Sequence, residues 1–182
     1  MTPMHGIATL LDAQHNSTVG NLWQKLEEDC DLTGIKLTPI PHFSWHVAEQ
    51  YNVPRLKDVL EGLAEASSSF TIRTNGLGLF TGDKPIIYIP IVKNERLIHY
   101  HRAIWEMVTD IGHGISQLYA PELWMPHITL AYGDVNRERL MCAMERLSFR
   151  NFNWEIQVDN VALISQEEGD LETQDLSFKF RL

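Results

Sequence analysis

The sequence predicts an α+β fold that is internally duplicated, and two observations carry this prediction. The first is the order of the predicted elements, which reads strand, helix, strand, helix, strand, strand over about residues 1–82 and again over about residues 85–182. The second is a short motif, Pro-His-x-Ser/Thr, which opens the third element of each half. Repetition of one unit along a chain is typical of a duplicated architecture. We therefore expect antiparallel sheets backed by helices, within a single domain that spans residues 1–182.

The composition is that of a globular protein with one sizeable core. The 182 residues are 44% hydrophobic and 21% charged, which is too apolar for a disordered chain. The longest apolar run covers residues 86–92 and is too short to span a bilayer. The amino-terminal residues lack the basic segment of a signal peptide, so a cytoplasmic location is expected. A formal net charge of −9 disfavours an extended nucleic-acid footprint, but it permits a site that reads one terminal phosphate.

Four helices are predicted from apolar residues at helical spacing. The first is expected to begin at Asn16 or Ser17 and to end before Gly34, whereas the second has Pro54 in its first turn and the fourth follows Asn136. Cys30 and Cys142 are expected as small core residues of the first and last helix, and not as a disulfide framework or a zinc site. The apolar stripes are Val19, Leu22, Trp23, Leu26 and Cys30; Leu56, Val59, Leu60 and Leu63; Leu97, His101, Ile104, Trp105, Val108 and Ile111; and Leu140, Met141, Met144 and Leu147.

Strands are predicted between these helices, from alternating runs and from runs rich in β-branched or aromatic residues. The acidic stretch 167–172 is expected to form a solvated loop between the last two strands. The predicted strands cover residues 5–11, 40–48, 69–75, 77–81, 86–92, 126–132, 154–164 and 176–182.

The paired motif places one imidazole and one hydroxyl in each half. The first copy reads Pro41-His42-Phe43-Ser44-Trp45-His46, and the second reads Pro126-His127-Ile128-Thr129-Leu130. Because alternate side chains of a strand point to opposite faces, His42, Ser44 and His46 are expected on one face, with the apolar residues on the other. His127 and Thr129 share a face in the same way. If a pseudo-twofold axis relates the halves, the two pairs face each other across a cleft.

This geometry suits phosphoryl transfer without a metal ion. A neutral imidazole can take a proton from an attacking water or hydroxyl, and an opposing imidazolium can protonate the departing oxygen. The two hydroxyls can donate hydrogen bonds to the non-bridging oxygens. Histidine suits both roles, since its ordinary pKa of about 6.5 makes both forms available near neutral pH.

The paired motifs resemble the HxTx motifs of the 2H phosphoesterase superfamily, which includes the bacterial RNA 2′,3′-cyclic phosphodiesterases also called 2′-5′ RNA ligases. The similarity covers nearly the whole chain through the element order, the motif spacing and the strand at Gly76–Phe80. It implies a bilobal fold in which two antiparallel sheets flank a central cleft, helices lie on the outer faces, and the lobes exchange elements of the two halves. It also implies His42 and His127 as the catalytic pair, with Ser44 and Thr129 on the phosphate. Ser44 in place of the more usual Thr, and the additional His46, depart from the commonest pattern.

Other polar and aromatic residues are weaker candidates. His46 is interpreted as a third catalytic group, a substrate contact or a half-exposed strand residue. A metal site formed by His42 and His46 is disfavoured, because the two residues lie about 13 Å apart in a strand with roughly 3.3 Å per residue. His101 is expected to be a hydrogen-bonded core histidine. Candidates for contact with a nucleotide base or phosphate are Phe80, Tyr88, Lys179 and Arg181.

The sequence therefore predicts a cytoplasmic, monomeric phosphoesterase that needs neither metal nor cofactor and makes no membrane contact. Its expected reaction opens a 2′,3′-cyclic phosphate at the end of an RNA or nucleotide. Two alternatives stay open: cleavage or ligation of a 2′-5′ phosphodiester, and a module that binds a nucleotide or RNA end without turnover. The two imidazoles favour catalysis, because binding alone needs no opposed acid and base.

Overall fold

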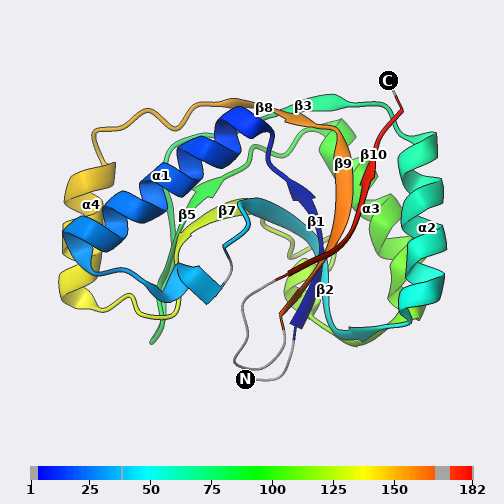
Figure 1. Ribbon diagram of the computed structural model, residues 1–182, viewed down its shortest axis with the longest axis horizontal. Coiled ribbons are helices and arrows are strands. Elements are labelled where there is room, and N and C mark those ends of the chain that lie inside the picture. The colour runs from blue at the N-terminus through cyan, green and yellow to red at the C-terminus, as the bar shows by residue number, and fades with distance from the viewer. Residues whose placement is uncertain (1–3, 38, 167–172, 182) are drawn as a thin grey trace.

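The computed structural model describes residues 4–37, 39–166 and 173–181 (Figure 1). The acidic stretch 167–172 lies outside the described residues. The described residues form three hydrogen-bonded sheets, all built from antiparallel strand pairs, and four α-helices. The predicted α+β class is confirmed. Two antiparallel sheets were expected, whereas the structure has three, because two smaller sheets occur in place of one of the expected sheets.

The largest sheet has five strands in the order β10-β9-β1-β2-β6. The helices α2 (Val53–Ala66) and α3 (Glu95–Val108) pack beside it, α2 against β9 and β10 and α3 against β2 (Figure 1). The strands of this sheet are β1 (Met4–Leu10), β2 (His42–Tyr51), β6 (Gly112–Ile115), β9 (Asn160–Gln166) and β10 (Thr173–Lys179).

The three-stranded sheet lies beside α1 (Ala13–Cys30) and α4 (Arg137–Leu147), toward the opposite end of the molecule, whereas the two-stranded sheet runs along the top of the view between the two groups of helices (Figure 1). An antiparallel bridge between Thr74 and Ile91 connects them. One sheet has the order β4-β5-β7 and the other pairs β3 with β8. Their strands are β3 (Phe70–Arg73), β4 (Gly78–Phe80), β5 (Ile86–Pro90), β7 (His127–Ala131) and β8 (Glu155–Val158).

The sheets exchange strands between the two halves of the sequence, as the family resemblance implied. The predicted strand 154–164 is interrupted at Asp159: β8 pairs with β3, whereas β9 pairs with β1 in the five-stranded sheet. The strand β6 was not predicted, because Gly112, His113 and Gly114 carry none of the β-branched residues that mark a strand. Each half therefore completes a sheet that the other half begins.

The helix boundaries differ from prediction mainly at α1. Asp12 caps this helix by accepting a hydrogen bond from the backbone N–H of His15, so α1 begins before the predicted Asn16 or Ser17. Its first turn is polar and so adds nothing to the apolar pattern. The helix ends at Asp31, which adopts a left-handed conformation with φ 55°. The predicted Pro54 turn of α2 and the Asn136 cap of α4 are confirmed.

A disulfide joins Cys30, the last residue of α1, to Cys142 of α4. The prediction that both cysteines are unpaired core residues is therefore wrong. Their Cα atoms are 5.7 Å apart, within the normal range for a disulfide. The two residues are 112 positions apart in the sequence, and only the packing of α1 on α4 brings them together.

A β-bulge follows the hydroxyl residue of each motif. In β2, Ser44 pairs with Ala8 and His46 pairs with Ile7, so Trp45 is the additional residue. In β7, Thr129 pairs with Tyr88 and Ala131 pairs with Ile87, so Leu130 is the additional residue. Both additional residues and the residues after them are buried. The bulge therefore lets the imidazole and hydroxyl alternate normally and then turns two consecutive side chains into the core.

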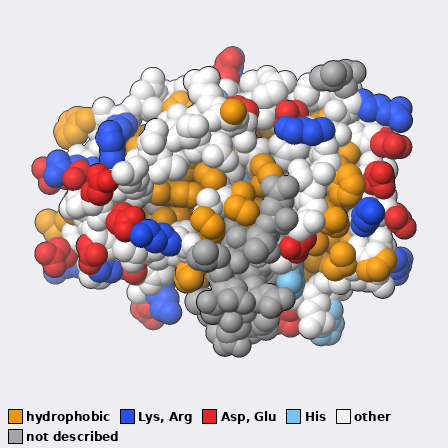
Figure 2. All heavy atoms as spheres, in the orientation of Figure 1, with side chains coloured by type: hydrophobic (Ala, Val, Ile, Leu, Met, Phe, Trp, Pro, Cys, Tyr) orange, Lys and Arg blue, Asp and Glu red, His pale blue; other side chains and the backbone are white. Residues whose placement is uncertain are grey.

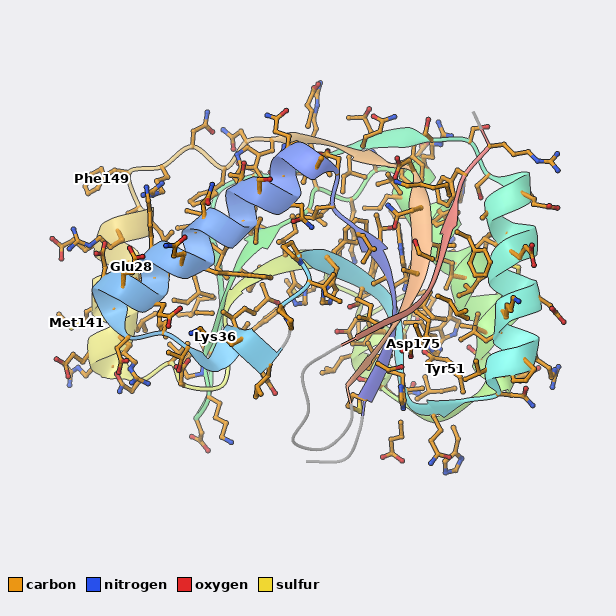
Figure 3. The ribbon with its side chains drawn as sticks, viewed as in Figure 1. Glu28, Lys36, Tyr51, Met141, Phe149 and Asp175 are labelled. Atoms are coloured by element: carbon orange, nitrogen blue, oxygen red, sulfur yellow. A yellow bond between two sulfur atoms is a disulfide. The ribbon has the colours of Figure 1, made fainter. Side chains whose placement is uncertain are left out.

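His46 lies in the core and does not share a face with His42, so the prediction from strand alternation is wrong. The bulge at Trp45 shifts the alternation by one residue. The His46 ring is completely buried against Trp105 of α3, and its Nδ1 is 2.6 Å from the hydroxyl of Tyr51 at the far end of β2 (Figure 3). Burial, with a smaller contribution from the nearby His101, lowers the pKa of His46 to about 4.

We expect loss of the disulfide to destabilise the fold. The double variant Cys30→Ala/Cys142→Ala should unfold with a free energy lower by about 2–4 kcal/mol, because the crosslink restricts the unfolded chain. Chemical denaturation with and without a thiol reductant measures this difference. The reductant should destabilise the wild-type protein and leave the double variant unchanged; equal unfolding midpoints for the oxidised wild type and the double variant would contradict the crosslink.

We expect buried His46 to destabilise the fold in acid. Its pKa is about 4 when folded against an ordinary 6.5, so its neutral form is favoured by folding. The contribution of neutral His46 to the free energy of unfolding is present in full above about pH 6.5 and declines as the pH falls toward 4. At pH 5 about 2 kcal/mol of this free energy is lost. His46→Phe should flatten the decline of the unfolding free energy between pH 7.5 and pH 5. His113→Phe, at an exposed position, serves as the control; parallel pH profiles for wild type and His46→Phe would exclude His46 as the titrating group.

Candidate active site

The two motif histidines make the same backbone contact. Nδ1 of His42 is 2.6 Å from the carbonyl oxygen of Ile40, and Nδ1 of His127 is 2.7 Å from that of Met125. A carbonyl oxygen only accepts hydrogen bonds, so each Nδ1 carries the proton. The contact fixes the tautomer, and Nε2 is the nitrogen that gains or loses a proton. Each acceptor lies two residues before its histidine, in the turn into the strand.

The imidazole of His127 affects the pKa of the His42 imidazole. The pKa of His42 is lowered to about 4, mainly by burial and also by charge repulsion from His127, while the hydrogen bond to Ile40 opposes the shift. Burial likewise lowers the pKa of His127, and the bond to Met125 opposes it. The strands β2 and β7, which carry the two histidines, contact one another at the centre of the molecule (Figure 1). The structure therefore places His42 and His127 on neighbouring strands, close enough for one imidazole to affect the pKa of the other.

The hydroxyl residues Ser44 and Thr129 are both half-buried and are fixed through their backbones. The indole N–H of Trp124 donates to the carbonyl of Ser44 at 3.0 Å, and that of Trp23 donates to the carbonyl of Thr129 at 3.1 Å. Both carbonyls lie next to a bulge, where the regular ladder is interrupted. An indole therefore anchors each bulge, Trp23 from α1 and Trp124 from the segment before β7.

Two aromatic side chains from the β4–β5 hairpin lie beside His127. Phe80 stacks on Tyr88 with 4.1 Å between ring centroids, and the His127 ring is 5.0 Å from Phe80 and 5.2 Å from Tyr88. Tyr88 is buried and Phe80 is half-buried. The position of Gly78, which pairs with Tyr88, requires a glycine, because a Cβ atom there would lie 2.3 Å from the Tyr88 ring. Both predicted aromatic contacts therefore belong to the His127 side of the site.

The two cations suggested by the sequence are engaged in ion pairs. Nζ of Lys179 is 2.9 Å from the carboxylate of Asp159, and the Arg181 guanidinium is 3.8 Å from that of Glu65. Figure 2 shows hydrophobic side chains gathered in the middle of one face, with acidic and basic side chains mixed toward its two ends. On this face positive charge is dispersed among acidic residues.

His101 has structural contacts in the core. His101 is buried, its Nε2 lies 3.1 Å from the Trp45 carbonyl and 3.0 Å from the Tyr119 carbonyl, and its ring stacks on Trp124. The predicted core role of His101 is confirmed. Over residues 4–37, 39–166 and 173–181, no three His, Cys, Asp or Glu side chains are grouped so that they could hold a metal ion. No helix in the same ranges is long and apolar enough to cross a membrane.

Tyr119 lies near the first motif but could not be identified from the sequence. Burial raises the pKa of the Tyr119 phenol, and the side chain of nearby Ser44 opposes this rise. Tyr119 belongs to a single 3-10 turn, Gln117–Tyr119, which has neither periodicity nor a recognisable motif. The carbonyls of Ile40 and Met125 also escaped prediction, because backbone atoms contribute to a site without any residue preference.

The fold is shared with solved structures of low sequence identity. A protein of Thermus thermophilus, TT0787, matches with a TM-score of 0.67 and 17% identity, covering 98% of each chain. A structure described as a phosphoesterase matches with a TM-score of 0.62 and 15% identity over 100% of both chains. LigT of E. coli, solved as a complex with 3′-AMP, matches with a TM-score of 0.61 and 15% identity over 99% of both chains. No curated protein sequence matched the chain.

The sequence itself matches one family model over most of its length. The model describes the 2′-5′ RNA ligase superfamily and covers residues 17–170, a range that includes both motifs, both bulges and the aromatic pair. This match agrees with the duplicated α+β fold and the paired histidines. The chain therefore belongs to the 2′-5′ RNA ligase superfamily, within the 2H phosphoesterases.

Proposed function

We propose that this protein is a metal-independent phosphoesterase that opens 2′,3′-cyclic phosphates at RNA or nucleotide ends by paired-histidine acid–base catalysis. Membership of the superfamily supports a phosphoesterase- or ligase-type activity. The observation that carries the finer proposal is the matched pair of imidazoles. His42 and His127 each use Nδ1 on a carbonyl, so both direct Nε2 to the chemistry, and each lies two residues from a hydroxyl.

In the proposed reaction, one neutral imidazole takes a proton from water through Nε2 as the water oxygen attacks phosphorus. The bond from phosphorus to one ribose oxygen breaks, and the opposing imidazolium gives its proton to that oxygen. The product is a ribose hydroxyl beside a phosphomonoester. The imidazole that acted as base has gained one proton, and the imidazolium that acted as acid has lost one. The hydroxyls of Ser44 and Thr129 donate to the non-bridging oxygens, where negative charge develops.

The electrostatics of the site fit an anionic substrate. Burial and repulsion from His127 lower the pKa of His42 to about 4, so this imidazole is neutral at neutral pH in the absence of substrate. A phosphate bound beside the imidazoles supplies the opposite charge that favours protonation of one of them. Substrate binding therefore creates the acid that the reaction needs, while the second imidazole stays neutral as the base.

The nucleoside is expected to bind on the His127 side. Phe80 is half-buried and backed by Tyr88, so its ring can accept a base by stacking without ordering a flexible side chain. The LigT structure that shares this fold holds 3′-AMP, a nucleotide with its phosphate on the ribose. This supports binding of nucleotides by the fold.

We expect His42→Ala and His127→Ala each to reduce kcat on a 2′,3′-cyclic nucleotide by at least about a thousandfold. The double variant should be little slower than either single variant, because the two groups act in one step. Phosphorus NMR in EDTA, over a panel of 2′,3′-cyclic nucleotides and 2′-5′ dinucleotides, measures turnover and identifies the bond that breaks.

His99→Ala, at an exposed position on α3, is the matched control and should retain wild-type turnover. Near-wild-type rates for either motif variant would refute the assignment. If only the dinucleotides are turned over, the substrate is a 2′-5′ phosphodiester and not a cyclic phosphate. Loss of activity in EDTA, with recovery when a divalent ion is added, would refute the metal-independent mechanism. Tight nucleotide binding with no turnover of any member of the panel would identify a binding module.

We expect Phe80→Ala to raise the KM for a cyclic nucleotide by roughly tenfold with little change in kcat, since stacking of one base contributes about 1–3 kcal/mol. A cyclic ribose phosphate without a base should have the same KM in both proteins. Phe149→Ala removes a phenyl ring that is 94% exposed near the end of α4, far from the site (Figure 3), and serves as the control. An unchanged KM for Phe80→Ala would exclude Phe80 as the base-binding surface.

A further inference from the structure

Each motif is anchored by an indole that comes from the other half of the sequence. Trp124, in the half at about residues 85–182, donates from Nε1 to the carbonyl oxygen of Ser44 at 3.0 Å. Trp23, in the half at about residues 1–82, donates from Nε1 to the carbonyl oxygen of Thr129 at 3.1 Å. The two bonds join residues that are 80 and 106 positions apart. The same contact therefore occurs twice, once at each hydroxyl residue of the candidate site.

We propose that Trp124 and Trp23 are positioning residues that direct the hydroxyls of Ser44 and Thr129, respectively, toward the phosphate. This inference rests on the proposed function, because it takes both hydroxyls as phosphate contacts. The peptide unit that carries the accepting carbonyl joins the hydroxyl residue to the additional residue of the bulge. Since a peptide unit is planar, a bond to its carbonyl restricts the ψ angle of the hydroxyl residue and hence the direction of its Cα–Cβ bond.

The bulge is the reason that each hydroxyl residue needs such a bond. In a regular ladder, hydrogen bonds to the neighbouring strand determine the backbone angles of each residue, whereas a bulge disrupts the ladder locally. Ser44 and Thr129 stand directly before Trp45 and Leu130, the additional residues of the two bulges. A donor from outside the strand pair therefore keeps the hydroxyl residue in one conformation, and in both motifs that donor is an indole N–H.

The indole at Ser44 is held rigidly by stacking. Trp124 is 2% exposed, and its ring centroid lies 3.8 Å from that of His101, with an angle of 2° between the two planes. Nε2 of the same histidine lies 3.1 Å from the carbonyl oxygen of Trp45. Two stacked rings therefore hold two successive carbonyls of the first bulge. An indole N–H only donates, so its partner in this bond is always the carbonyl oxygen.

The indole at Thr129 is held by a helix. Trp23 lies on α1, which contacts β7, and its side chain is half-buried against the hydrophobic core. The buried Val19, Leu22 and Leu26 fix the rotation of α1 about its axis. The Trp23 side chain therefore approaches the second motif strand in one orientation, and a shift of α1 would move the donor away from the Thr129 carbonyl.

The test is a set of double-mutant cycles that pairs each indole with each hydroxyl. Trp124→Phe and Trp23→Phe retain an aromatic ring and remove the N–H donor. We expect each variant to lower kcat/KM on a 2′,3′-cyclic nucleotide, and to raise the Kd for adenosine 3′-monophosphate, by about fivefold, as loss of one hydrogen bond would. Calorimetry measures this Kd on the folded molecules and without turnover. The Kd for adenosine, which has no phosphate, should be unchanged in both variants.

The pairing separates positioning from general structural support. In the Ser44→Ala background, Trp124→Phe should have no further effect on the Kd for adenosine 3′-monophosphate, whereas in the Thr129→Ala background it should keep its full fivefold effect. Trp23→Phe should show the reverse pattern. Trp154→Phe removes an indole N–H that donates to a backbone carbonyl outside both motifs at 3.2 Å, and it is the matched control.

An unchanged kcat/KM and Kd for either indole variant would overturn the inference. Equal effects in both hydroxyl backgrounds, or a parallel rise in the Kd for adenosine, would also overturn it, because the indoles would then support the fold and not a particular hydroxyl. If Ser44→Ala and Thr129→Ala bind adenosine 3′-monophosphate as the wild type does, the inference is wrong together with the phosphate role of the hydroxyls. Failure of the proposed reaction alone is distinct: the wild type would then turn over no member of the substrate panel, whereas the pattern of Kd values still tests the indoles.

Discussion

The bulges after Ser44 and Thr129 are the constraint on which the site depends. A regular strand would place every second side chain on the site face, so His46 and Ala131 would follow the motif pairs there. The additional residues Trp45 and Leu130 instead shift the alternation by one position, so that His46 and Ala131 are buried. One imidazole and one hydroxyl of each strand thus remain half-buried at the site. The same register on both strand pairs places two such units opposite each other.

The supports of the two motifs come from distant parts of the chain. Trp23 of α1 holds the second bulge, and Trp124 holds the first. The disulfide between α1 and α4 adds a covalent link on the side of the molecule that includes Trp23. The buried His101 connects α3 to both the first bulge and the turn that carries Tyr119. The geometry of the two motifs therefore depends on α1, on α3 and on the connection between β6 and β7.

The approximate symmetry of the halves gives two similar acid–base groups, and its departures give the site a direction. Phe80 and Tyr88 lie beside His127, at the end where we place the nucleoside. A symmetric pair of histidines could act on a phosphate from either side. Under the proposed function, these unequal surroundings would favour one orientation of a bound nucleotide.

The sequence by itself determined the fold class, the four helices, the paired His42 and His127, and the aromatic candidates Phe80 and Tyr88, because periodicity and repetition are local properties of a chain. It placed His46 on the wrong face, since a bulge depends on the register of two strands and leaves no residue signature. It also missed the Cys30–Cys142 disulfide and the strand β6, both of which depend on residues far apart in the sequence. Only the packing of the elements decides such contacts, because chain connectivity alone does not specify which distant surfaces meet.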